Sequence, residues 1–172
     1  SGYGLIFVHD RGPITEAIRD ILGDIRGVGE RCAMVSPGGL GEPWHYRLTT
    51  TTADEAWHDF LEVYQVVKDN SRDGFVTVMP CVSMLFRRLG VEGVRKFIAG
   101  LCELAIGDGQ LAFPIAKPSS IEPIRGIASE LSTCWRVEKM GAATILYGEI
   151  PYTGIYYLSP GPSGKYRIIP VE

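Results

Sequence analysis

Loops follow four of the apolar segments in this sequence. The loop after the first segment carries polar side chains that could take part in acid–base catalysis. His9 and Asp10 come directly after residues 4–8, and a histidine beside a carboxylate can act as a general base. Neighbouring residues of a strand point to opposite faces, so a relay between these two would need a sharp turn. The pattern therefore favours a loop in which Asp10 caps the following helix, and it leaves a catalytic role as the alternative.

Two further loops could bind a small anion. Lys117, Ser119 and Ser120 precede a predicted helix, where hydroxyl and backbone N–H groups can hold an anion, although helix capping accounts for the serines equally well. Residues 36–41 are rich in glycine, but the next arginine or lysine along the chain is Arg47. We therefore expect a flexible loop at 36–41 and regard Lys117 with the two serines as the better candidate.

The first predicted strand, loop and helix have the order of a phosphate-binding P-loop, in which several glycines and a lysine surround the phosphates. The loop at 9–15 has one glycine, Gly12, one arginine, Arg11, and no lysine. Asp10 would repel a phosphate, and Pro13 has no backbone N–H to donate. We therefore expect no triphosphate, no metal and no cofactor here, and keep these loop residues as weak candidates for binding another ligand.

Two groups of side chains could form contact surfaces. One is a basic cluster, which could hold nucleic acid or an acidic partner unless it forms solvated helix faces paired with Glu92 and Glu103. Its members are Arg87, Arg88, Arg95 and Lys96. The other is a tyrosine-rich segment near the end of the chain, where Tyr156 and Tyr157 could contact a partner unless they pack in the core.

Composition limits the classes of function. A net charge of −3 and a pI near 5.7 argue against a surface dedicated to nucleic acid. The four cysteines have no CxxC spacing, which favours free thiols over a zinc site or a disulfide framework. No apolar run approaches the roughly 20 residues of a membrane span, and no secretion signal is visible. We expect a cytoplasmic protein that does not enter a membrane.

Strands and helices alternate over most of the chain, which predicts an α/β fold with a mostly parallel central sheet and helices on both faces. The predicted strands are residues 2–8, 31–36, 46–48, 74–79, 110–116 and 134–138. The predicted helices are residues 13–25, 53–70, 81–88, 91–106 and 121–131, and Thr52 with Glu55 forms a capping box before the second of them.

The last part of the sequence has a different pattern, in which predicted strands follow one another without helices between them. Three β-rich segments, 142–150, 154–159 and 166–171, are joined by short turns and predict an antiparallel meander. No linker or internal repeat separates the meander from the rest. We therefore expect one domain over 1–172, with 142–172 as a C-terminal β extension.

The chain resembles the RecA/KaiC superfamily, and within it degenerate archaeal domains of unknown function that are attached to regulatory proteins. The resemblance is best over 52–138. It is carried by residues 74–101, GFVTVMPCVSMLFRRLGVEGVRKFIAGL, and by residues 110–120, QLAFPIAKPSS, which look like the magnesium-site strand, the two helices after it and the next strand of those proteins.

The resemblance implies a RecA-like fold, and members with intact motifs hydrolyse ATP and form rings or filaments. This chain departs from both motifs. Its loop at 9–15 lacks the lysine of a P-loop, and the strand that resembles the magnesium-site strand ends in Val78, Met79 and Pro80. We therefore expect a non-catalytic regulatory or protein-interaction domain that binds a protein partner or forms a homo-oligomer. The alternatives are a ligand-binding protein or enzyme that uses the strand-end loops, and a DNA-binding accessory protein.

Overall fold

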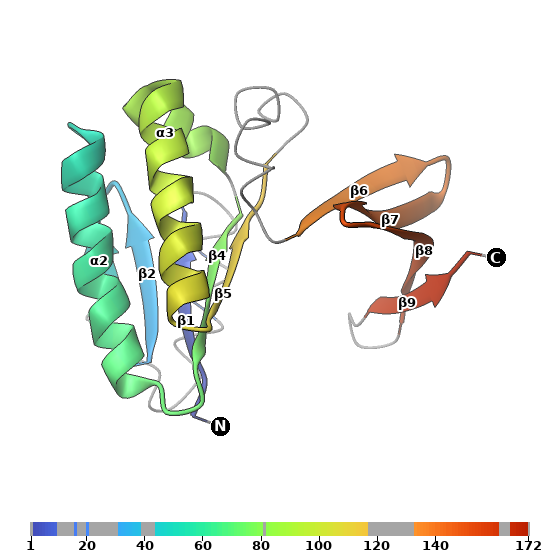
Figure 1. The fold of residues 1–172 in the computed structure, drawn as a ribbon, viewed down its shortest axis with the longest axis horizontal. Helices are drawn as coiled ribbons and strands as arrows, with labels where there is room; N and C mark the ends of the chain where they lie inside the picture. The colour runs from blue at the N-terminus through green and yellow to red at the C-terminus, as the bar shows by residue number, and fades with distance from the viewer. Residues whose placement is uncertain are drawn as a thin grey trace. The chain divides into compact units, whose positions relative to one another are not determined.

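A computed structural model of the chain describes residues 2–9, 16, 20, 31–38, 44–80, 82–116, 133–161 and 166–171. The chain divides into two compact units, Ser1–Ile124 and Arg125–Glu172. Each unit contains one β-sheet (Figure 1).

The sheet of the first unit has five strands, all of them parallel, in the order β3-β2-β1-β4-β5. The strands are β1 (Gly4–Val8), β2 (Cys32–Ser36), β3 (His45–Arg47), β4 (Phe75–Met79) and β5 (Leu111–Pro114). β1 lies at the centre and is apolar on both sides, as a strand covered by helices must be. The predicted α/β fold with a mostly parallel sheet is confirmed.

Helix α2 (Ala53–Asn70) begins where the sequence predicts. The Thr52 hydroxyl accepts a hydrogen bond from the Glu55 backbone N–H at 3.2 Å and donates to the Glu55 carboxylate at 3.1 Å. These two bonds fix the first turn of the helix, where backbone donors lack helical partners. The buried face of α2 consists of Ala56, Phe60, Val63, Tyr64 and Val67.

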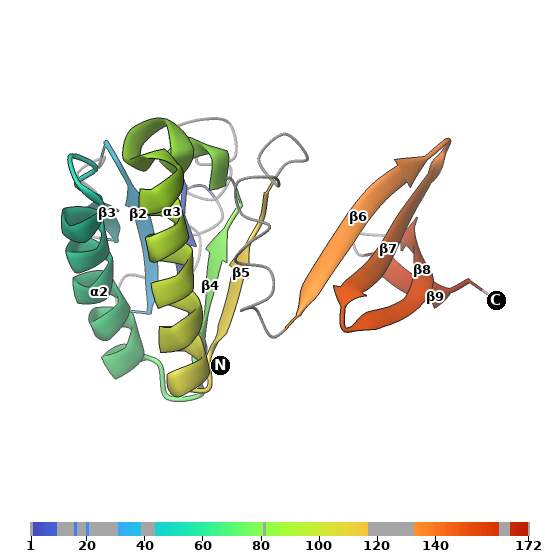
Figure 2. The same cartoon turned by 45° about the horizontal axis from the view of Figure 1, so that its top comes forward.

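Helix α3 (Val82–Gly107) is broken at Gly90, whose φ of 69° and ψ of 178° are not helical. The two predicted helices, 81–88 and 91–106, therefore lie on either side of this residue. α2 and α3 lie side by side on one face of the sheet (Figure 2). Trp57, Phe60 and Phe97 pack between them, with ring centroids 5.3 to 5.6 Å apart.

The two other predicted helices, 13–25 and 121–131, lie outside the described residues except for Glu16 and Asp20, which are helical and exposed. No helix of the described ranges is both long and apolar enough to span a membrane.

The second unit is a four-stranded antiparallel sheet in the order β6-β7-β8-β9. Its strands are β6 (Cys134–Met140), β7 (Ala143–Ile150), β8 (Tyr152–Pro160) and β9 (Tyr166–Pro170). The predicted strand at 134–138 exists, but its place in the parallel alternation was wrong. It pairs antiparallel with β7, because the two-residue turn at Gly141 and Ala142 returns the chain directly beside it.

Candidate functional site

The carboxyl ends of parallel strands are where ligands bind in open α/β sheets, so the site begins with the residue after β1. His9 is buried, its backbone N–H donates to the Val35 carbonyl at 3.0 Å, and its ring stacks on Phe7 with centroids 5.9 Å apart. These contacts tie His9 to the end of β2. Asp10, Arg11 and Gly12 lie outside the described residues, so their part in ligand binding stays a prediction.

The end of β5 is joined to the start of α3. Ile115 donates its backbone N–H to the Met79 carbonyl at 2.8 Å and accepts from the Val82 N–H at 3.2 Å. These bonds hold the exit of β5 against the turn between β4 and α3. Lys117, Ser119 and Ser120 follow beyond the described residues, and the anion site predicted there is therefore not tested.

A buried serine–histidine pair lies at the end of β2. Ser36 Oγ is 2.7 Å from His45 Nε2, and both side chains are buried. Parallel pairing positions them, since His45 lies opposite Met34 and the Leu48 N–H donates to the Ser36 carbonyl. Trp44 stacks on the imidazole at a centroid distance of 6.1 Å.

A serine hydroxyl bonded to an imidazole has the arrangement of a nucleophile and its base. Ser36, however, has no exposed surface, so a substrate cannot reach its hydroxyl in this conformation. The bond instead satisfies a hydroxyl that would otherwise be buried without a partner. We interpret the pair as a structural connection between β2 and β3.

β4 lies between β1 and β5 in the parallel sheet. Its five residues, FVTVM, contain no carboxylate, and Pro80 follows directly. Thr77 and Met79 are both buried, and β4 pairs with β1 on one side and β5 on the other. The last side chain of this strand, Met79, is therefore apolar and buried.

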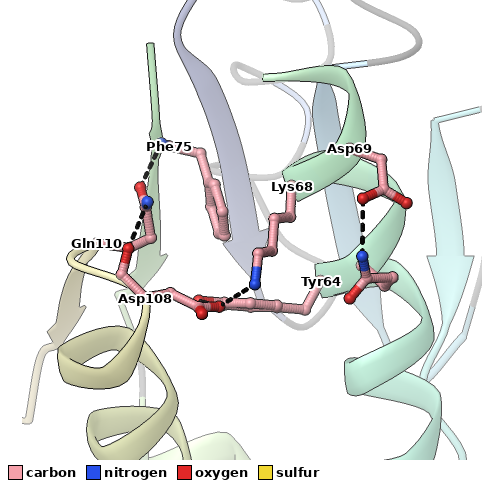
Figure 3. A network of polar contacts seen from close by, with 7 residues as sticks. Tyr64, Lys68, Asp69, Phe75, Asp108 and Gln110 are labelled. Carbon is pink, nitrogen blue, oxygen red and sulfur yellow. Dashed lines mark hydrogen bonds and ion pairs between the residues drawn. The ribbon is translucent and has the colours of Figure 1, made fainter. Parts of the chain in front are cut away.

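A polar network lies at the opposite end of the sheet, where β4 and β5 begin (Figure 3). The Asp108 carboxylate accepts from the Tyr64 hydroxyl at 3.1 Å and from Lys68 Nζ at 2.8 Å. The Gln110 side chain donates to the Asp108 carbonyl at 3.0 Å and accepts from the Phe75 N–H at 2.8 Å. The network connects the last turn of α2 with the starts of β4 and β5.

Electrostatics within this network follow from its hydrogen bonds. The bond from Lys68 holds the pKa of Asp108 below its ordinary value, which favours the carboxylate. Burial and the neighbouring Asp108 raise the pKa of Tyr64, which keeps the phenol protonated. The network lies at the amino ends of the strands, away from the edge where ligands are expected, and we interpret it as structural.

The predicted basic cluster is divided by the kink in α3. Arg87 and Arg88 are exposed before Gly90, whereas Arg95 is half-buried and Lys96 exposed after it. The contact surface predicted for these four side chains, and its alternative of solvated helix faces paired with Glu92 and Glu103, both stay predictions.

Tyr156 and Tyr157 lie on opposite faces of the second sheet. Tyr156 is opposite Leu146 of β7, and Tyr157 is opposite Ile145. Residues directly opposite each other in an antiparallel pair share a face, and successive residues alternate between faces. Tyr156 also contacts Trp135, with ring centroids 6.3 Å apart. The two tyrosines therefore cannot contribute to one contact surface on a single face.

Comparison with known proteins gives the fold. No family model and no curated protein matches the chain. The uncharacterized protein PH0321 from Pyrococcus horikoshii, solved in complex with an unknown peptide, has a TM-score of 0.70 at 10% sequence identity, over 97% of this chain and 80% of that chain. The KaiC-like protein PH0186 from the same archaeon has a TM-score of 0.61 at 15% identity, over 98% and 77%. The fold is KaiC-like.

A KaiC-like fold at this level of identity establishes architecture and no residue roles. The likeness includes nearly all of the chain, which agrees with the RecA/KaiC resemblance of residues 52–138. The serine–histidine pair and the Asp108 network could not be predicted from the sequence. Each depends on contacts between segments whose neighbours are decided only when the sheet order is known.

Proposed function

We propose that this chain is a non-catalytic protein-binding module with a KaiC-like fold, which does not hydrolyse ATP. The observation that carries the proposal is the end of β4. Magnesium in phosphoryl transfer is held mainly by oxygen ligands such as carboxylates. β4 instead ends in the buried Met79, followed by Pro80, so this central strand supplies no such ligand.

The end of β1 supports the same conclusion. His9 is buried and packed on Phe7, and the sequence at 9–15 contains no lysine that could neutralise a triphosphate. A nucleotide at this loop would therefore lack the lysine on which P-loop proteins depend. The chain lacks both a carboxylate in β4 and a lysine at 9–15, and the absence of both favours a role other than ATP hydrolysis.

Protein binding is favoured by the exposed apolar surface of the second unit. One face of its sheet carries the cross-strand pairs Val137 with Leu146 and Leu158 with Ile168. Trp135, Val137 and Ile168 are exposed on that face. Contiguous apolar surface of this kind is typical of contacts with other proteins. The structural neighbour PH0321 was itself solved with a peptide.

Calorimetric titration of the purified chain with ATP and Mg²⁺ tests the nucleotide part of the proposal. We expect no saturable binding up to ligand concentrations of about 1 mM, which corresponds to a free energy weaker than roughly −4 kcal/mol. A His9→Ala variant serves as the matched control and should give the same flat titration. Micromolar, magnesium-dependent binding that this variant loses would contradict the proposal.

A further inference from the structure

Strand β6 forms an open edge of the second sheet. In the part of the chain that the structure describes, it pairs with β7 on one side and with no strand on the other (Figure 2). Its sequence, CWRVEKM, contains no proline that would remove a backbone donor. Trp135 and Val137 on this strand are 48% and 59% exposed. The whole length of the edge can therefore accept another strand.

The hairpin of β6 and β7 decides which backbone groups point outward. Met140 and Ala143 flank its two-residue turn, and residues in that position form a hydrogen-bonded pair. Bonded and non-bonded pairs alternate along an antiparallel ladder. Counting back from the turn, the residues of β6 in non-bonded pairs are Trp135, Val137 and Lys139. Their N–H and carbonyl groups therefore point to the open edge.

A hydrogen bond in β7 supports this assignment. Gly148 lies opposite Trp135 in the register of the two strands. Its N–H donates to Thr153 Oγ1 of β8 at 2.8 Å, on the side away from β6. The pair of Gly148 with Trp135 is therefore not bonded by this N–H, as the alternation requires.

The sequence of β6 is complementary to itself in the antiparallel direction. When two copies are paired about Val137, that residue faces its own counterpart and Trp135 faces Lys139. These are the outward positions, so each pair can exchange both backbone hydrogen bonds. Arg136 then faces Glu138 twice, once in each direction, at non-bonded positions where opposite side chains come closest.

Other registers lose this match. A shift of two residues places Arg136 opposite Arg136 or Glu138 opposite Glu138, and like charges directly opposite each other are destabilising. A shift of one residue places outward backbone groups opposite groups that are bonded to β7. Charges on an edge normally discourage pairing with other strands. Here they disfavour wrong registers and match a second copy of the same strand.

We propose that β6 pairs with β6 of a second copy, antiparallel about Val137, and joins the two four-stranded sheets across a twofold axis. Arg136 can serve this contact, since its ion pairs with Glu149 and Glu138 use Nε and Nη1 at 3.2 and 3.4 Å. The Nη2 group is a further donor for the second copy's carboxylate. The proposal goes beyond the protein-binding function above and does not rest on it.

Charge exchange at two positions tests the register in the full chain. Sedimentation equilibrium should give a dimer for the parent chain. Arg136→Glu and Glu138→Arg each place like charges opposite each other twice, and each should raise the dissociation constant of the dimer at least tenfold. An equimolar mixture of the two variants should dimerise as the parent does, because opposite charges then meet at both positions. Arg167→Glu, on the other edge strand β9, is the matched control and should change nothing.

A backbone variant tests the edge without altering the ion pairs of Arg136. Val137→Pro removes an outward N–H and no bond to β7, and it should weaken the dimer at least tenfold. Val137→Ala keeps the N–H and is the matched control, which should still dimerise. Circular dichroism establishes that each variant keeps its strands, and the charge variants remain informative if Val137→Pro does not fold.

Amide hydrogen exchange locates the interface. Protection of the Val137 amide should rise with protein concentration, whereas the Arg136 amide, bonded to β7, should be protected throughout. A parent chain that stays monomeric up to about 1 mM would overturn the proposal. So would a dimer that is insensitive to the charge variants and to Val137→Pro. Protection of Val137 that is independent of concentration would also overturn it and assign the edge to another segment of the same chain. None of these readouts involves ATP.

Discussion

Lys68 and Asp108 are separated by 40 residues in the chain, and their side chains meet at 2.8 Å. Lys68 belongs to the last turn of α2, and Asp108 follows the end of α3. The ion pair therefore holds together the ends of the two helices that cover one face of the parallel sheet.

Asp108→Asn should destabilise the first unit at neutral pH, because it removes the charge that Lys68 faces. The pKa of Asp108 is lowered in the folded state, so its contribution is present above the ordinary value of about 3.9 and is lost as the pH falls through the folded value. Urea unfolding at several pH values should show a difference between parent and variant at pH 7 that shrinks below about pH 4. Asp69→Asn, at an exposed carboxylate that accepts a bond from Gln65, is the control, and an equal loss there would contradict this account.

Tyr64→Phe should lower the free energy of unfolding by about 1 kcal/mol, the typical contribution of one hydrogen bond. The ring should stay in place, since it packs edge-on against Phe75 at 4.7 Å. The raised pKa of Tyr64 means that its contribution is present below about pH 10 and is lost as the pH rises further.

Denaturant unfolding at pH 7 and at alkaline pH measures both effects. Tyr152→Phe, at an exposed position of the second unit, should leave stability unchanged. An ultraviolet titration in which the Tyr64 phenol ionises together with the exposed tyrosines would contradict the assigned environment.

Gly90→Ala should destabilise the first unit by about 1 to 3 kcal/mol through backbone strain. The φ of 69° and ψ of 178° at Gly90 belong to a region open essentially only to glycine, whereas a methyl group there would meet no atom within 4 Å. Gly107→Ala is the matched control, because its surroundings are equally open and its φ is not positive. If both variants unfold at the same denaturant concentration, strain at the kink is not the reason for glycine there.

Ser36→Ala should cost about 1 to 3 kcal/mol of stability, since it deletes a hydroxyl bonded to a buried imidazole. Equilibrium unfolding measures the free energy of unfolding of this variant and of the control Thr51→Ala, which removes an exposed hydroxyl. A variant as stable as the parent chain would show that the bond is not structural and would reopen a chemical role for Ser36.

Local signals predicted most elements of the first unit. The capping pattern at Thr52 and Glu55 placed the start of α2, and the two helices predicted at 81–88 and 91–106 lie on either side of the break in α3 at Gly90. The continuous apolar run at 74–79 predicted the strand β4, in which Phe75, Thr77 and Met79 are buried and Val76 and Val78 are half-buried. Each of these signals acts within a few residues.

Long-range relationships could not be predicted in the same way. The strand at 134–138 has the composition of either sheet, and only its pairing with β7 assigns it to the antiparallel one. Ser36 meets His45 because β2 and β3 pair in parallel, and Asp108 meets Lys68 because α2 and α3 end side by side. Residue types alone did not identify these partners.

The most direct test of the non-catalytic assignment is phosphate release from ATP in the presence of Mg²⁺. The purified chain should release no more phosphate than a matched preparation of the Gly90→Ala variant, and neither rate should exceed that of buffer. Magnesium-dependent release that co-purifies with the chain and is abolished by changing His9 or Lys117 would contradict the account.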